Sequence, residues 1–109
     1  MKYAATYQSF DSPAEGSWSL DEIVYRAPSG GLLDVVHDLS ALAARSGKEW
    51  RELFDRRAGA RDFPDRSGVW GKREWVLPQI ASEHIVSLGE GNTQLLPAVR
   101  LGRELGVPS

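Results

Sequence analysis

Cysteine is absent from this chain of 109 residues, which excludes disulfides, thiolate zinc sites, iron–sulfur clusters and a cysteine nucleophile. No apolar run approaches the roughly 20 residues of a membrane-spanning helix, and residues 1–3 begin no signal-peptide core. The chain also lacks an excess of charge of either sign. Its 13 Lys and Arg residues are nearly balanced by 15 Asp and Glu residues, which leaves a net charge of −2. That balance argues against binding of nucleic acid or of an anionic membrane, both of which need a basic surface. We expect a soluble, cytoplasmic protein.

Aromatic residues and glycines are plentiful by comparison. Four Trp, three Tyr and three Phe accompany eleven Gly and six Pro, and hydrophobic residues make up 41% of the chain. A chain of this length forms one domain at most and buries only about two-thirds of its unfolded surface. Each aromatic side chain buries on the order of 150–250 Å². We therefore expect the aromatic residues inside the fold rather than on a binding face.

Residues 1–60 are predicted to form a small module in which strands precede helices. A β-branched and aromatic run at 23–25 and an apolar run at 32–36 have the composition of strands. The Pro- and Gly-rich stretch at 27–31 between them is typical of a turn. Together they predict a β-hairpin.

Helix signals follow the second of these strands. Asp38 is the expected N-cap of a first helix that ends before Gly47. Ser46 and Glu49 fit a capping box, because each side chain can satisfy the free backbone donor of the other. The second helix should end at Gly59 and carry an apolar stripe at helical spacing, formed by Trp50, Leu53 and Phe54.

Residues 61–84 are interpreted as an irregular connection, and residues 85–109 as the start of a truncated α/β domain. Its expected parts are a strand at 85–88, a tight turn at 89–93 and a helix at 98–105 that Gly106 terminates. A strand and helix of this kind normally continue into a parallel neighbouring strand. We therefore expect the rest of that domain to lie outside this chain.

The turn at residues 89–93 is the most distinctive stretch of the sequence. It reads Gly89, Glu90, Gly91, Asn92 and Thr93. Two glycines around one acidic residue can present backbone N–H groups to a phosphate or carboxylate. The alternative is a tight turn whose glycines supply positive φ angles, and the missing third glycine of a nucleotide signature favours this alternative.

A basic stretch precedes this turn. Its cations lie within 18 positions: Arg56, Arg57, Arg61, Arg66, Lys72 and Arg73. An anion-binding surface is one interpretation of such a cluster. Acidic residues interleave with the cations, however: Asp55, Asp62, Asp65 and Glu74. A self-paired, solvated surface is therefore the favoured interpretation.

The residues typical of catalysis form no recognisable constellation. His37 and His84 are the only histidines, and the spacing of His37 from Asp34 and Asp38 matches no zinc pattern. A capping or surface role is expected for both histidines. No nucleophile elbow of the GxSxG type is present. We accordingly assign no catalytic, cofactor-binding or metal-ligating residue to this chain.

Three stretches together resemble the N-terminal region of the threonine synthases. They are Ser67-Gly68-Val69-Trp70 with Glu74-Trp75-Val76-Leu77-Pro78, then Ile85-Val86-Ser87-Leu88-Gly89-Glu90-Gly91-Asn92-Thr93, then Leu101-Gly102-Arg103-Glu104-Leu105-Gly106-Val107. Residues 21–25, 30–35 and 55–57 are similar to the small N-terminal module of many members. Many relatives carry a cysteine zinc ribbon there, whereas this chain has Ala27 and Ser29 near the second cysteine pair. Gln94 also replaces the usual proline after the GNT motif.

The resemblance implies a fold, a cofactor and a reaction. The fold class is α+β or partial α/β: the small module followed by the opening strand, turn and helix of a pyridoxal-phosphate fold-type II domain. Such a lyase converts O-phosphohomoserine and water to threonine and phosphate, with pyridoxal 5′-phosphate held on a lysine beyond the GEGNT motif. The only lysines here are Lys2, Lys48 and Lys72, and none lies in such a context. This chain is therefore expected to hold no cofactor and to be inactive without the remainder of the catalytic domain.

Two alternatives stay open. A related pyridoxal-phosphate enzyme such as cysteate synthase resembles threonine synthase closely at this end. A free-standing noncatalytic module, docking on a partner through the region of Trp70 and Trp75, is the alternative from a different class.

Overall fold

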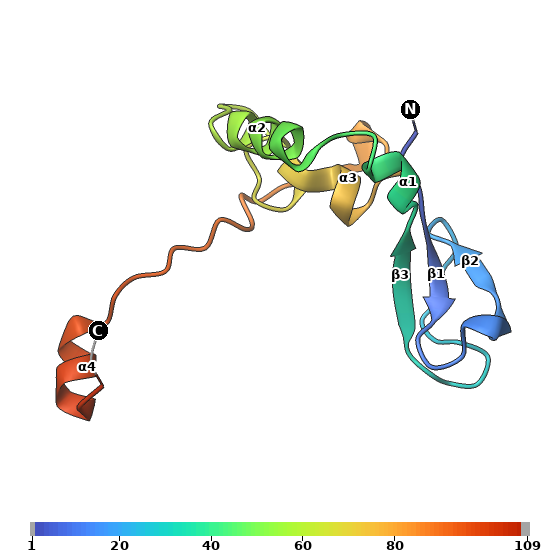
Figure 1. The fold of residues 1–109 in the computed structure, drawn as a ribbon, viewed down its shortest axis with the longest axis horizontal. Helices are drawn as coiled ribbons and strands as arrows, with labels where there is room; N and C mark the ends of the chain where they lie inside the picture. The colour runs from blue at the N-terminus through green and yellow to red at the C-terminus, as the bar shows by residue number, and fades with distance from the viewer. Residues whose placement is uncertain (1, 108–109) are drawn as a thin grey trace.

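The computed structural model describes residues 2–107 and has a three-stranded antiparallel sheet with four α-helices (Figure 1). The strands are β1 Ala5–Ser9, β2 Ser17–Ser19 and β3 Leu33–His37. The helices are α1 Leu39–Leu42, α2 Gly47–Ala58, α3 Arg73–Val76 and α4 Val99–Leu105, with 3₁₀ turns at Pro13–Glu15, Trp70–Lys72 and Ser82–His84. The radius of gyration is 18.6 Å, against about 13 Å for a compact domain of this length. Figure 1 shows the reason, because an extended segment holds α4 away from the other elements.

The sheet has the order β2-β1-β3, with β1 in the centre. Thr6 pairs with Ser19 on one side and with Val36 on the other. The predicted strand at 32–36 is confirmed as β3, but the predicted hairpin partner at 23–25 is wrong. Both edges of β1 are already filled by β2 and β3, so residues 23–25 have no strand to pair with, and Tyr25 is 87% exposed.

The helix signals are confirmed with one correction. The Asp38 side chain accepts hydrogen bonds from the backbone of Ser40 and Ala41 at the start of α1. Ser46 and Glu49 form the capping box of α2, and α2 ends at Gly59 as predicted. Gly47 does not terminate the first helix, because α1 stops at Leu42 and Gly47 is the first residue of α2.

Four aromatic rings pack together where the N-terminal segment, α2 and α3 meet. The Trp50 ring lies 5.6 Å from Tyr3, 5.4 Å from Phe54 and 5.5 Å from Trp75, measured between centroids. This cluster joins the N-terminal segment, α2 and α3 in a single contact. The expectation that aromatic residues lie inside is therefore right for Trp50, which is buried, but wrong for Phe10 and Tyr25, which are exposed.

Long-range polar contacts hold residues 61–84 against residues 1–60. The Arg57 guanidinium donates two hydrogen bonds of 2.7 Å to the Glu74 carboxylate and one of 2.7 Å to the Gly71 carbonyl. The Gln79 side chain contacts both backbone groups of Ala5, accepting at 3.3 Å and donating at 2.7 Å. Ala5 lies just beyond the end of the β1–β2 ladder, so the Gln79 amide continues that ladder in place of a strand residue.

The predicted strand at 85–88 is wrong, because these residues have no regular secondary structure. A strand needs a neighbour for its backbone groups, and the sheet of the described chain lies elsewhere, in residues 5–37. The C-terminal helix is confirmed, with Gly106 in the left-handed conformation at its end. Leu88 and Leu95 are 94% and 97% exposed, so the segment before α4 is almost uncovered.

Candidate functional site: the glycine clasp

The two sequence motifs around Gly68 and Gly91 contact each other directly, although 23 positions separate these glycines. We call the paired segments, residues 67–70 and 87–92, the glycine clasp. The Gly68 N–H donates a 2.9 Å hydrogen bond to the Glu90 carbonyl. A Cβ atom added to Gly91 would lie 2.7 Å from the Gly68 Cα, and a Cβ atom on Gly68 would stand against the Asn92 nitrogen. The close approach therefore requires glycine on both sides.

The Glu90 carboxylate fastens the clasp. Its Oε1 accepts hydrogen bonds of 2.5 Å from the Ser67 hydroxyl and 3.0 Å from the Ser87 hydroxyl, and its Oε2 accepts one of 2.8 Å from the Leu88 N–H. These bonds, led by the one from Ser67, lower the pKa of Glu90 to about 2. Glu90 is thus ionised at neutral pH.

Ser67 is the second centre of the clasp. Its hydroxyl oxygen accepts hydrogen bonds of 3.1 Å from the backbone of both Val69 and Trp70, while its proton goes to Glu90. Only 3% of the residue is exposed. The sequence drew attention to residues 89–93 but did not indicate that Ser67 is their partner. The signal that could have found it is the Ser-Gly pair that opens the segment 67–70.

The backbone of residues 89–93 agrees with the turn interpretation rather than with an anion site. Gly89 and Gly91 both have φ of 78°, and Asn92 has φ of 49°. The Gly89 N–H donates a 3.3 Å hydrogen bond to the Ser87 hydroxyl, and the N–H of Leu88, just before the turn, is used by the Glu90 carboxylate. That carboxylate would repel an incoming anion. Asn92 and Thr93 lie on the exposed side of the clasp.

The predicted self-pairing of the basic stretch is confirmed in part: among the described residues, two of its six cations, Arg57 and Arg73, form ion pairs with its acidic residues. Arg57 binds Glu74, and the Arg73 guanidinium lies 2.6 Å from the Asp65 carboxylate. His84 is exposed, and residues 2–107 contain no group of three or more His, Asp or Glu side chains arranged to hold a metal ion. No helix in the same range is long and apolar enough to cross a bilayer.

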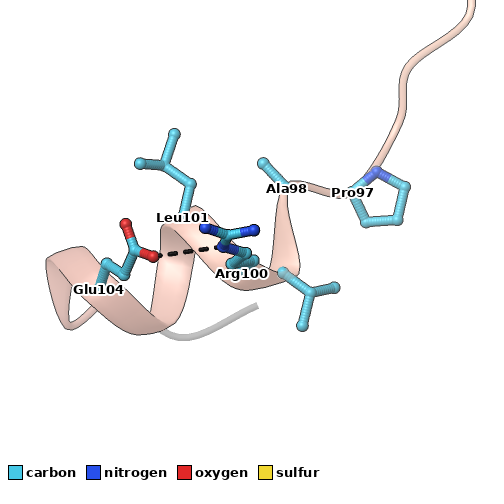
Figure 2. A pocket seen from close by; sticks show the side chains of 6 residues that line it. Pro97, Ala98, Arg100, Leu101 and Glu104 are labelled. Atoms are coloured by element: carbon cyan, nitrogen blue, oxygen red, sulfur yellow. Dashed lines mark hydrogen bonds and ion pairs between the residues drawn. The ribbon is translucent and has the colours of Figure 1, made fainter.

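Two hollows of the surface have few side chains in their lining that could take part in a reaction. One of about 420 Å³ lies on α4 and is lined only by residues 97–101 and 104, among them the Arg100 and Glu104 side chains, which pair at 3.4 Å (Figure 2). It marks the uncovered side of a short helix rather than an enclosed site. A second, of about 280 Å³, lies beside Gln79 and has Asp21 and His84 at its rim.

The lysines are held away from any such site. The Lys72 ammonium donates a 3.2 Å hydrogen bond to the Gly68 carbonyl, at the base of the clasp. Lys48 lies on the surface of α2, where its ammonium is 3.8 Å from the Glu52 carboxylate.

Comparison with known proteins gives two informative matches. The chain is 52% identical over 103 residues to threonine synthase 2, chloroplastic, of Arabidopsis thaliana, a match that covers 93% of this chain and 20% of that protein. It is 32% identical over 91 residues to threonine synthase of Methanocaldococcus jannaschii, covering 84% of this chain and 20% of the archaeal protein. This chain is a relative of the threonine synthases. No family model matches it.

The match to the Arabidopsis threonine synthase includes the whole clasp, because it omits only a few residues of the chain. The resemblance that the sequence motifs indicated is therefore confirmed. The chain spans about one fifth of the length of both threonine synthases, which is consistent with an N-terminal region.

Proposed function

We propose that this chain is the N-terminal region of a threonine synthase-like lyase, which converts O-phosphohomoserine and water to threonine and phosphate. The observation that carries the proposal is the 52% identity to a threonine synthase over 93% of the chain. The glycine clasp supports it, because the two motifs that resemble the family most closely are spatial partners and not independent coincidences.

The role of the clasp in such an enzyme is structural. Glu90 and Ser67 hold residues 87–92 in one conformation, with Asn92 and Thr93 on the exposed side. We propose that Gly89, Glu90, Gly91, Asn92 and Thr93 form a rigid turn beside the active-site cleft. A turn that is fixed before substrate arrives lowers the entropic cost of orienting whatever binds there.

The cofactor belongs to the remainder of the enzyme in this proposal. Pyridoxal 5′-phosphate, bound to a lysine, supplies the electron sink for chemistry at the amino-acid substrate. The residues of this chain do not fit that role, since Lys2 and Lys48 are exposed and Lys72 is bonded to the Gly68 carbonyl. We assign no reaction step to this chain and propose that it is inactive alone.

The partner is the remainder of the catalytic domain, which would continue from α4. A helix of seven residues is too short to be stable in water by itself, so α4 needs a covering surface. Its apolar residues Leu101 and Leu105 are exposed, as are Leu95 and Leu96 before it. This exposed stretch is what we propose the remaining domain covers.

The test is complementation. The chain is mixed or fused with the remaining four-fifths of the Arabidopsis threonine synthase, and phosphate release from O-phosphohomoserine is measured. Restored turnover that is lost with Gly91→Val supports the proposal, and Gly30→Val serves as a control outside the clasp. A separate assay of the full-length protein that contains this chain distinguishes the related enzyme, because activity on O-phosphoserine instead of O-phosphohomoserine would indicate a cysteate synthase.

A second function is favoured if complementation fails. Trp75 is 48% exposed and Val76 41% exposed, which is an apolar surface suited to docking of a noncatalytic module. Binding of a hydrophobic dye that Trp75→Gln abolishes would support this alternative. For either function we propose a cytoplasmic location, and a fluorescent fusion would distinguish it from the plastid location in the name of the Arabidopsis relative.

A further inference from the structure

The outer edge of β3 pairs with no other strand among residues 2–107. Hydrogen bonds from Phe10 N–H to the Leu32 carbonyl, 3.0 Å, and from Asp38 N–H to the Ala4 carbonyl, 2.9 Å, fix which residues face β1. Even-numbered residues of this strand bond to β1, so odd-numbered residues direct their backbone groups outward. Within the described part of the chain β3 has no neighbour on that side. The outward backbone groups belong to Leu33, Val35 and His37.

The Asp34 side chain accepts a hydrogen bond from the central backbone donor of this edge. Its carboxylate Oδ1 accepts a 2.8 Å hydrogen bond from the Val35 N–H, which would otherwise be free to bond another strand. The neighbouring apolar side chains would favour association of this edge with another strand, because Val35 is 40% exposed and Val36 is 41% exposed. A charged residue on an apolar edge strand is a common protection against association through that edge.

We propose that the outer edge of β3 is a pairing surface for β3 of a second copy of this chain, and that Asp34 keeps it unpaired. The edge is self-complementary. An antiparallel two-fold pair centred on Val35 places Leu33 opposite His37 of the second copy and Val35 opposite itself. Every outward N–H and C=O group of the strand then has a partner.

Asp34 opposes this pairing in two ways. Its carboxylate competes with the second copy for the Val35 N–H at the centre of the pair. In the centred register the two Asp34 side chains also stand on the same face of the joined sheet. They are diagonal neighbours about 7–8 Å apart, and two negative charges at that distance repel each other.

The experiment compares self-association of the wild-type chain and Asp34→Ala by sedimentation velocity over a range of concentrations. We expect Asp34→Ala to associate at least about tenfold more tightly, with new hydrogen-exchange protection at the amides of Leu33, Val35 and His37. Asp55→Ala is the matched control, because it removes the same charge from an exposed position on α2. Equal association of wild type and Asp34→Ala, at any level, would refute the role of Asp34.

A second variant separates edge pairing from association caused by unfolding. Val35→Pro in the Asp34→Ala background removes the central outward N–H while leaving the bonds to β1 intact, because Val35 does not bond to β1. If pairing is through the edge, this double variant returns to the monomer. If it associates as strongly as Asp34→Ala, the edge is not the interface and the proposal is wrong.

Discussion

Replacing Gly68 with alanine tests the glycine clasp at its closest contact. The new Cβ atom would stand against the Asn92 nitrogen and lie 2.7 Å from the Gly91 carbonyl carbon, closer than real Cβ atoms approach backbone. Gly68 does not adopt a left-handed φ, so the cost comes from crowding alone. Crowding of this kind costs about 1–3 kcal/mol. Loss of the Gly68–Glu90 backbone bond adds about 0.5–1.5 kcal/mol.

The expected total for Gly68→Ala is thus about 1.5–4.5 kcal/mol of clasp stability. The crowded atoms belong to backbone on both sides, so side-chain rotation cannot relieve the contact. The cheapest relief is separation of the two segments, which leaves the sheet and α2 folded. The measurement is therefore local: hydrogen exchange at the amide of residue 68, which the clasp protects through its bond to the Glu90 carbonyl. We expect that protection to disappear while the α2 amides keep theirs.

Three other glycines separate crowding from backbone strain. Gly91→Ala combines both, because Gly91 has φ of 78° as well as the close contact, and it should cost about 1–2 kcal/mol more than Gly68→Ala. Gly30→Ala has strain alone, with φ of 86° and no neighbour within 4 Å, and should leave hydrogen exchange at the Gly68 amide unchanged. Gly47→Ala has neither and should be neutral or stabilising by about 0.4–1 kcal/mol. If Gly68→Ala behaves like Gly47→Ala, the clasp contact does not exist in solution.

Three further predictions concern ionic and polar contacts. The pKa of the Glu90 carboxyl should be about 2 in the folded chain and 4.5 in the unfolded chain, which NMR titration measures. The contribution of Glu90 to stability should therefore be complete above about pH 4.5 and be lost as the pH falls toward 2. Glu74→Gln leaves the nearly buried Arg57 cation without its carboxylate and should cost about 2–4 kcal/mol in urea unfolding, discounted from about 3–5 for a fully buried pair. Gln79→Ala removes both bonds to Ala5 and should cost about 1–2 kcal/mol in the same assay.

Each of these has a matched control. Ser67→Ala removes the principal cause of the low pKa of Glu90 and should raise its titration midpoint, whereas an unchanged midpoint would show that this bond is absent. Lys48→Met breaks an exposed pair and should cost less than about 0.5 kcal/mol. Gln94→Ala alters an exposed amide and should leave stability unchanged; a cost equal to that of Gln79→Ala would contradict the ladder-continuing role.

Local signals in the sequence were sufficient to predict where the helices begin and end. The N-cap at Asp38, the capping box of Ser46 and Glu49, and the terminators Gly59 and Gly106 each involve backbone within a few residues of the signal. Their geometry depends little on the rest of the fold, so composition and spacing predict them. The start of α2 at Gly47 is consistent with this, because the capping box immediately before it already marked that position.

The strands and the clasp depend on contacts with segments distant in the sequence, and no local pattern predicts which segments these are. Residues 23–25 have the composition of a strand, yet β1 pairs with residues 17–19 and 33–37 instead. Residues 85–88 have a similar composition, but no strand pairs with them within residues 2–107. The contact of Gln79 with Ala5 spans 74 positions, and that of Glu90 with Ser67 spans 23. Side-chain periodicity contains no information about such pairings, so the site was predicted as a turn but not as half of a two-part structure.

The clasp gives a physical reason for four residues of the two motifs. Glycine at 68 and 91 is demanded by backbone contact, serine at 67 and glutamate at 90 by the hydrogen bonds between them. The Glu90 carboxylate accepts hydrogen bonds from three donors, one of which is the Ser67 hydroxyl. What the motif contributes is the position of the exposed residues that follow it. Loss of activity in a complemented enzyme carrying Gly91→Val would therefore reflect displacement of residues 92–93, and substrate affinity should fall along with turnover.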